Sequence, residues 1–301
     1  MRISTQNMFQ RPLSALLERQ SALSRTQNQL ATGKAILSPS DDPAASTRIL
    51  ELKNFDKLTS QYQGNLSTLE GRLSLVEHSL DSGIDALQRS RELVIRAGNA
   101  SLSDADRDTI ASEIDEQLSI LMGAANTKDG NGELIFAGFN SKQTAAVSET
   151  SPGVYSYNGD QGERSLQSSQ SGTIRMNDNG FDLFMNIEHS SGTNQSVFDT
   201  LNDISTELRS NTLSADTLTD IDSSMNSLLN TRTSVGARLN AVDAQKDIND
   251  AYQVFIQSSL SEIEDLDYAE AFSRFSLESV GLEAAQKTFS QVQNLSLFNF
   301  I

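Results

Sequence analysis

The sequence contains no cysteine and no tryptophan, and it has only two histidines, His78 and His189, among 301 residues. Without cysteine the protein cannot have disulfide bonds, a thiol nucleophile or a thiolate metal site. Two histidines are too few for a histidine metal cluster, and neither has a recognisable serine or aspartate constellation around it. No apolar run approaches the roughly 18 residues of a membrane span. We therefore expect no catalytic residue, no cofactor and no metal.

Positive charge is also scarce, because 23 Lys and Arg face 40 Asp and Glu, which gives a net charge of −17. A chain this acidic repels phosphate and anionic lipid, so neither nucleic acid nor membrane is expected as a partner. The charge is uneven: residues 1–50 carry six basic and three acidic groups, whereas residues 251–301 carry two basic and seven acidic groups. Opposite charge at the two ends favours their pairing with each other over self-pairing.

Glycine separates the centre of the chain from its flanks. Ten of the 17 glycines lie between Gly123 and Gly192. The runs 133–137, 153–157, 173–176 and 181–184 are strand-like, and Asn-Gly pairs at 158–159 and 179–180 favour tight hairpin turns. The centre is therefore predicted to be a small β domain inserted between helical flanks.

The N-terminal flank is predicted to form long helices. A first helix of about 20 residues ends near Gly33. Asp42 can cap a second helix that begins at Pro43, where no amide donor is needed, and continues to Ala97. At about 1.5 Å per residue this helix would be on the order of 80 Å long. Such a length predicts an elongated protein.

Helix is expected again after these segments. A third helix begins near Ser103, where acidic residues in its first turn suit the helix dipole. The spacing of Asp104, Asp106 and Asp108 also imitates a calcium loop, but the required turn glycine is absent, so the helix start is the better interpretation. Beyond the centre, helix resumes near Ser196 and continues from about residue 215 to the C-terminal flank, where residues 265–268 interrupt it little.

Both ends of the chain carry apolar residues at intervals of seven, which is the pattern of a coiled-coil seam. These residues, each expected to pack against a neighbouring helix in an assembly, are Phe9, Leu16, Leu23 and Leu30 at one end, and Tyr268, Phe275, Leu282, Phe289 and Val292 at the other. If the two terminal helices packed only against each other, part of each seam would remain exposed to solvent. We therefore expect the seams to serve both the hairpin and subunit packing.

The expected fold is mainly α with a small inserted β domain, a long antiparallel helical bundle or coiled coil built from both termini. Residues 1–42 with 266–301 would form a terminal coiled-coil assembly domain. Residues 43–130 with 196–265 would form a helical rod domain, and residues 131–195 an inserted β-rich outer domain.

Several segments in both flanks resemble the bacterial flagellin family. They are RISTQNMF (2–9), QLATGK (29–34), SPSDDPAA (38–45), RTSVGARLN (232–240) and DLDYAEA (265–271). Within the family, the DDPAA segment, the last eight residues and the central segment 133–164 are more similar to the member that joins hook to filament than to the filament subunit.

The resemblance implies a structural role without catalysis. It implies a ring of identical copies at the junction between hook and filament, which seats the first flagellin subunits by coiled-coil packing of its terminal helices. The implied partners are hook-associated protein 1 on the hook side, flagellin on the filament side, and the flagellar type III export apparatus, with an export chaperone left open. The alternative is a short flagellin that forms the filament itself.

The implied location is the extracellular flagellum, reached through the export channel. The first twelve residues lack the apolar block of 7 to 15 residues that a cleaved secretory signal needs, which fits this route. A chain without disulfides also suits passage through a narrow channel.

Overall fold

The computed structural model describes residues 2–99 and 101–294, with side chains for residues 10–99 and 101–291. The fold is mainly α-helical with small two-stranded antiparallel sheets, which confirms the predicted fold class. The chain forms two compact units. Unit 1 comprises the chain up to Leu58 and from Ala251 onward, and unit 2 comprises Thr59–Asp250.

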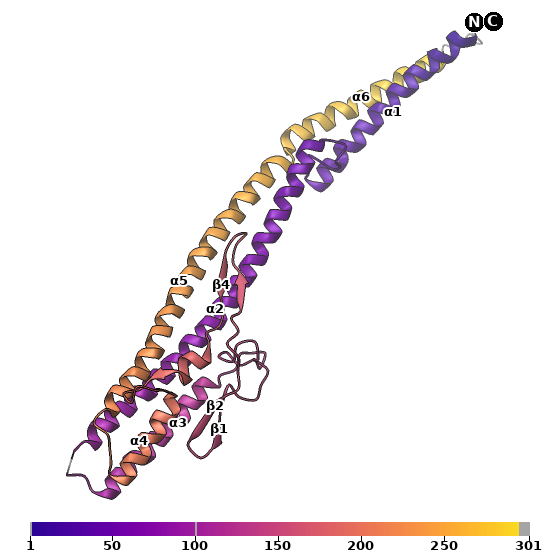
Figure 1. The fold of residues 1–301 in the computed structure, drawn as a ribbon. Coiled ribbons are helices and arrows are strands. Elements are labelled where there is room, and N and C mark those ends of the chain that lie inside the picture. The colour runs from indigo at the N-terminus through magenta and orange to yellow at the C-terminus, as the bar shows by residue number, and fades with distance from the viewer. Residues whose placement is uncertain (1, 100, 295–301) are drawn as a thin grey trace. The chain divides into compact units, whose positions relative to one another are not determined.

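Six α-helices make up most of the described residues, and Figure 1 shows their arrangement. They are α1 (Arg2–Thr32), α2 (Pro43–Ala97), α3 (Asp104–Ala125), α4 (Val197–Ser210), α5 (Thr217–Glu264) and α6 (Tyr268–Asn294). The bounds of α2 are those that the sequence predicts. The first helix is longer than the predicted 20 residues, because it begins at Arg2.

Helix starts follow the capping rules. The Asp42 side chain accepts a hydrogen bond of 2.9 Å from the amide of Ala45 at the start of α2. Ser103 and Asp106 form a reciprocal capping box before α3. The acidic residues at positions 104–108 thus belong to a helix start, as predicted. Ser196 caps α4 by accepting a hydrogen bond of 2.9 Å from the amide of Asp199.

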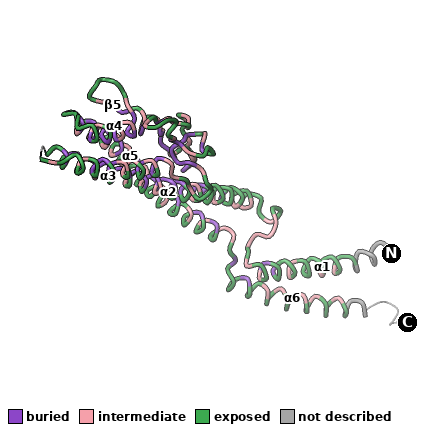
Figure 2. The backbone as a smooth tube through the Cα atoms, turned by 90° about the horizontal axis from the view of Figure 1, so that it is seen from below, coloured by how far each residue is buried: buried purple, intermediate pink, exposed green. Residues whose placement is uncertain are grey.

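The core of unit 2 is built on seven-residue repeats in two long helices. The α2 repeat consists of Leu66, Leu73, Leu80, Leu87 and Val94, and the α5 repeat of Ile221, Leu228, Val235 and Val242. All of these side chains are buried, which Figure 2 shows as the purple stretches of the helices. At Gly83 an added Cβ would lie 3.0 Å from Leu228 of α5 and 3.1 Å from Leu121 of α3. Glycine at this position therefore allows three helices to approach closely.

The inserted segment packs against these helices through its own hairpins and aromatic residues. The hairpins are β1 (Val147–Ser151) with β2 (Val154–Tyr157), β3 (Ser165–Gln167) with β4 (Thr173–Arg175), and β5 (Ile187–Glu188) with β6 (Asn194–Gln195). Phe136 and Phe184 meet edge to face, with ring centroids 5.2 Å apart, and Phe184 also contacts Phe198 of α4. These rings join the same hydrophobic core as α2 and α5.

Three sequence predictions for local structure are wrong. Residues 133–137 form no named strand, and residues 181–184 lie in a short π-helix, Phe181–Met185. Leu134, Ile135 and Phe136 are all fully buried, and a short apolar run that is buried on every side does not reveal its backbone geometry. The Asn-Gly pairs do not turn the hairpins. The β1–β2 turn uses Gly153 instead, at φ +76°, where the positive angle favours glycine.

Unit 1 consists of two helix pairs. Non-helical residues separate one pair from the other at two places in the chain. In one pair α1 and α6 lie side by side and antiparallel (Figure 1). In the other, the first turns of α2 and the last turns of α5 enclose a small cluster of Leu52, Ile256 and Leu260. Residues 33–42 connect α1 to α2, and residues 265–267 separate α5 from α6. The prediction that residues 265–268 interrupt the last helix little is therefore wrong.

Candidate assembly interface

The two sequence-predicted seams face each other in unit 1. The side chains of Leu16, Leu23, Leu30, Phe275, Leu282 and Phe289 are all half-buried in the α1–α6 pair. Tyr268 is 51% exposed, but its hydroxyl lies beside Gly33, where an added Cβ would be 2.8 Å from it. The side chains of Phe9 and Val292 lie outside the described residues. The structure thus brings the two seams together, and it leaves them only partly shielded from water.

Few side chains are fully buried in this pair. In the described parts of the two helices they are Thr26, Gln29 and Ala271, all near the break. Figure 2 shows α1 and α6 as mostly exposed or intermediate, in contrast to the buried core of unit 2. Helix pairs with so little buried surface gain most of their stability from further packing partners.

The opposite net charges of the two ends do not form ion pairs between α1 and α6 in the described residues, and the ion pairs of α6 lie within the helix. Arg19 occupies the space next to Gly281, where an added Cβ would lie 2.6 Å from its guanidinium. One carboxylate oxygen of Glu278 is buried and has no hydrogen-bond partner within the described part of the chain.

The two helix breaks are bound to each other by a set of contacts that we call the clasp, formed by Gly33, Lys34, Ala35, Lys53, Glu264 and Leu266. The amide of Ala35 donates to the Glu264 carbonyl at 2.8 Å, and the amide of Leu266 donates to the Gly33 carbonyl at 3.0 Å. Gly33 has φ +71°, which suits glycine, so the chain can turn sharply here.

The side chain of Glu264 completes the clasp. Its carboxylate lies 2.5 Å from Lys34 Nζ and 2.9 Å from Lys53 Nζ, and only 13% of the side chain is exposed. The hydrogen bond from Lys34, assisted by Lys53, holds the pKa of Glu264 below its usual value, although burial acts in the opposite direction. Glu264 therefore stays ionised and connects the loop after α1, the start of α2 and the end of α5.

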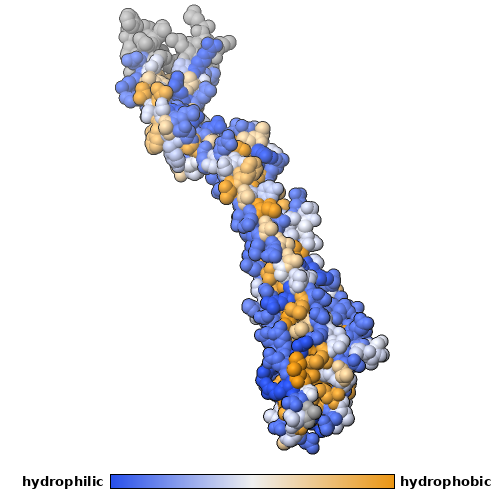
Figure 3. All heavy atoms as spheres, turned by 90° about the vertical axis from the view of Figure 1, so that its left-hand side faces the viewer, coloured by the Kyte–Doolittle hydropathy of each residue, from blue (hydrophilic) through white to orange (hydrophobic). Residues whose placement is uncertain are grey.

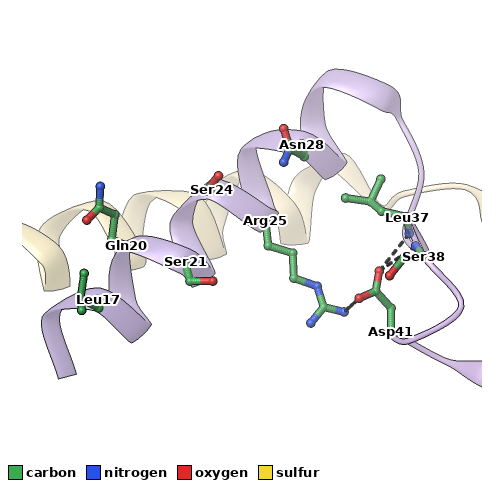
Figure 4. A pocket seen from close by; sticks show the side chains of 9 residues that line it. All are labelled: Leu17, Gln20, Ser21, Ser24, Arg25, Asn28, Leu37, Ser38 and Asp41. Carbon is green, nitrogen blue, oxygen red and sulfur yellow. Dashed lines mark hydrogen bonds and ion pairs between the residues drawn. The ribbon is translucent and has the colours of Figure 1, made fainter. Parts of the chain in front are cut away.

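An open pocket of about 580 Å³ lies between α1 and residues 37–41 (Figure 4). Asp41 shapes its edge by accepting hydrogen bonds from the amides of Leu37 and Ser38, at 3.1 and 3.0 Å. The bond from Ser38 is the main reason that the pKa of Asp41 is lowered. Arg25 reaches across from α1 to Asp41 at 2.9 Å. The rest of the lining is uncharged: Leu17, Gln20, Ser21, Ser24, Asn28, Leu37 and Ser38.

Unit 1 also carries most of the exposed apolar surface. Among the residues whose side chains the structure describes, 17 large hydrophobic ones are exposed, and twelve of these belong to unit 1. Those on α1 and α6 are Leu13, Leu17, Tyr268, Phe272, Leu277 and Val280. Figure 3 shows hydrophobic residues at the surface next to the terminal atoms drawn in grey. Exposed apolar side chains that gather in one part of a protein are typical of an interaction surface.

The sequence prediction missed the outward-facing members of this set. Phe272, Leu277 and Val280 do not fall on the seven-residue repeat of the seam, so the repeat alone did not select them. The available signal was a second group of apolar residues on the same helix, turned away from the first.

His189 has partners that the sequence did not suggest. Its Nε2 lies 3.0 Å from Asp220, and its Nδ1 lies 3.0 Å from the Ser191 hydroxyl. Asp220 is buried and also accepts hydrogen bonds from the amide and hydroxyl of Ser190, at 2.7 and 2.9 Å. The sequence did not reveal this group, because Asp220 lies far from His189 along the chain. These bonds attach the β5–β6 hairpin to the start of α5.

The described residues contain no group of three or more His, Asp or Glu side chains placed to hold a metal ion. Within the same part of the chain, no helix is long and apolar enough to cross a membrane.

Comparison with known proteins identifies the family. Residues 3–141 match the bacterial flagellin N-terminal helical region, and residues 218–301 match the bacterial flagellin C-terminal helical region. Flagellar hook-associated protein 3 of Salmonella typhimurium is 27% identical over 99% of both chains. Flagellin of Bacillus subtilis is 24% identical over 93% of this chain and 92% of the relative.

Solved structures agree. A protein from Vibrio parahaemolyticus, provisionally assigned as a flagellar hook-associated protein, has a TM-score of 0.66 and 26% identity over 75% of this chain and all of that one. The chain therefore belongs to the bacterial flagellin family, whose members are structural proteins of the flagellum and not enzymes.

Proposed function

We propose that this protein forms the junction ring between hook and filament and seats the first flagellin subunits. The observation that carries the proposal is its similarity to hook-associated protein 3, which spans 99% of both chains at 27% identity. The similarity to flagellin, at 24%, is weaker but also extends over most of the chain. The proposed partners are further copies of itself, hook-associated protein 1 on the hook side and flagellin on the filament side.

The α1–α6 pair is the proposed assembly element. Its seam is only half-buried and its outer faces expose large apolar side chains, so it gains stability when neighbouring helices cover it. Phe9, Leu16, Leu23 and Leu30, with Tyr268, Phe275, Leu282, Phe289 and Val292, are proposed to form the apolar layer of the ring. The division into terminal, rod and inserted outer domains, and export through the flagellar type III apparatus with or without a chaperone, belong to the same proposal.

Deletion of the gene tests the function directly. We expect electron microscopy to show intact hooks without filaments, and a blot of the medium to show unpolymerised flagellin. Restoring the full-length chain should restore the filaments. Filaments that persist on the deletion strain would contradict the junction role.

The alternative, a short flagellin, makes a different prediction. In that case the purified chain would polymerise by itself into long filaments under conditions that polymerise flagellin. We expect purified chain to form no such filaments, because a junction subunit needs the hook end as its template. Sedimentation and electron microscopy of the same sample distinguish the two.

We further propose that α1 and α6 become stably helical only on assembly. The pair buries few side chains in the single chain, so folding of these helices alone recovers little of its entropic cost. Hydrogen exchange on the free protein should show fast exchange in residues 10–32 and 268–291 and slow exchange in the α2–α5 core. Strong protection of both terminal helices in the monomer would contradict this hypothesis.

A further inference from the structure

The α1–α6 pair has two outer faces of different character, and both remain uncovered. On α6, a turn of 100° per residue places Leu277 and Val280 opposite Phe275 and Leu282, which pack toward α1. Leu277 is 72% exposed, Val280 67% and Phe272, at the border of this face, 59%. These are among the largest exposed fractions for hydrophobic residues in the described chain. We call this surface the α6 ridge: Phe272, Ser273, Ser276, Leu277 and Val280.

The outer face of α1 borders a hollow. Leu17, Ser21, Ser24 and Asn28 lie opposite Leu23 and Leu30 and form one wall of the open pocket. The loop 37–41 forms the other wall, so that the two enclose a hollow, as Figure 4 shows. Leu13 and Leu17, which are 44% and 55% exposed, extend the hollow with apolar surface toward the start of the helix. We call this surface the α1 groove.

Charge favours contact between the two different faces. From Gln10 onward, α1 carries three arginines and one glutamate, whereas α6 carries three glutamates, one arginine and one lysine. A ridge packed on a second ridge would bring like net charge together, and so would a groove packed on a groove. The centre of the ridge is itself uncharged, with serines that let another helix approach.

We propose that the α6 ridge of one copy docks in the α1 groove of a second copy of this chain. A contact that uses two different faces of each subunit is heterologous, so it repeats from copy to copy instead of ending at a dimer, and it forms a ring when the rotation between copies closes. This inference rests on the proposed junction function and specifies which surfaces of the terminal helices make the contact between copies. It is separate from the seam, which packs α1 against α6 within one copy.

Engineered cysteines test the contact without background, because the natural chain has none. The test variant is Ser24→Cys with Ser276→Cys, which places one thiol in the groove and one on the ridge, both at exposed positions. Flagella purified from cells that produce this variant are treated with a short bismaleimide, and a denaturing gel is blotted for the protein. We expect a ladder of dimers, trimers and larger species. The matched control, Ser24→Cys with Ser82→Cys, has its second thiol at an exposed position of unit 2 and should give no ladder.

The outcomes separate the inference from the proposed function. A dimer from Ser276→Cys alone would indicate ridge-to-ridge contact and overturn the inference. Absence of multimers, in flagella that contain the variant and carry normal filaments, would overturn the inference and leave the junction function standing. Absence of the wild-type chain from purified flagella would overturn both. If Ser24→Cys, Ser276→Cys does not enter flagella, Ser21→Cys with Ser273→Cys provides the same test one turn away.

A second measurement removes an anchor of the contact. Leu277→Lys in the test background should lower the crosslinked fraction by about tenfold or more, as expected when an apolar anchor leaves an interface. Ile95→Lys changes an apolar residue of unit 2 that is also exposed, at 53%, and should leave the ladder unchanged. Equal ladders in both variants would refute the ridge as the docking surface.

Discussion

Glu264 is the residue whose replacement should reveal what the clasp contributes to unit 1. Glu264→Gln keeps the size of the side chain and removes the charge that both Lys34 and Lys53 contact. The carboxylate is largely shielded, but each lysine is about half exposed, at 48% and 47%. Charged hydrogen bonds contribute about 1.5–3 kcal/mol when shielded and exposed ion pairs less than about 1 kcal/mol. We therefore expect Glu264→Gln to weaken the clasp by about 1–2 kcal/mol.

Hydrogen exchange resolved to single amides can measure this loss. The amides of Ala35 and Leu266 are the probes, because both form backbone hydrogen bonds across the clasp. A loss of about 1–2 kcal/mol corresponds to roughly 5- to 30-fold faster exchange through local opening. Glu51→Gln is the matched control, because it also removes a carboxylate from an ion pair, but both Glu51 and its partner Arg48 are exposed. Unchanged exchange at both probes in Glu264→Gln, or an equal change in the control, would refute the reasoning.

The same site predicts a pH dependence. The pKa of Glu264 in the folded protein is below 4.5, its ordinary value. The clasp therefore contributes its full stability above the unfolded pKa and loses that stability as the pH falls below 4.5 through the folded pKa. Protection at Ala35 should decline over this range in the wild type. In Glu264→Gln the part of the decline that depends on this carboxylate should be absent.

The remaining predictions concern assembly and the core of unit 2. Leu23→Ala or Phe289→Ala should weaken ring assembly, with a typical cost of about 2–5 kcal/mol per truncated side chain, and leave the melting of unit 2 unchanged; normal filament attachment in both would contradict the assigned seam. Gly83→Val should destabilise unit 2 by about 1–3 kcal/mol in chemical denaturation, because the added methyl groups meet side chains from two other helices. An unchanged denaturation midpoint would show that the neighbouring helices move apart without cost, and would contradict this prediction. Asp178→Asn should lower the free energy of unfolding by about 3–5 kcal/mol, since it leaves the largely buried Arg238 without its carboxylate partner. The double variant Asp178→Asn with Arg238→Met should recover part of that loss.

Long-range sequence patterns predicted much of the helical structure. The repeat in α2 continues to Val94, close to the end of the helix, and Asp42 and Pro43 mark its start by local chemistry, so both ends could be predicted. The pairing of α1 with α6 followed from matching seams and opposite charge. Short segments were less predictable, because the runs at 133–137 and 181–184 are apolar without a period long enough to distinguish strand from helix.

Only the tertiary structure separated the surfaces that pack inside one copy from those that remain free. The seam residues were selected by their repeat, and the structure shows most of them half-buried in the α1–α6 pair. The α6 ridge and the α1 groove are the sides of the two helices that stay uncovered after that pairing. A repeat within one helix cannot predict which sides these are. The clasp has the same origin: Lys34 and Glu264 are 230 positions apart, and their contact exists because two separate helix breaks meet in the folded chain.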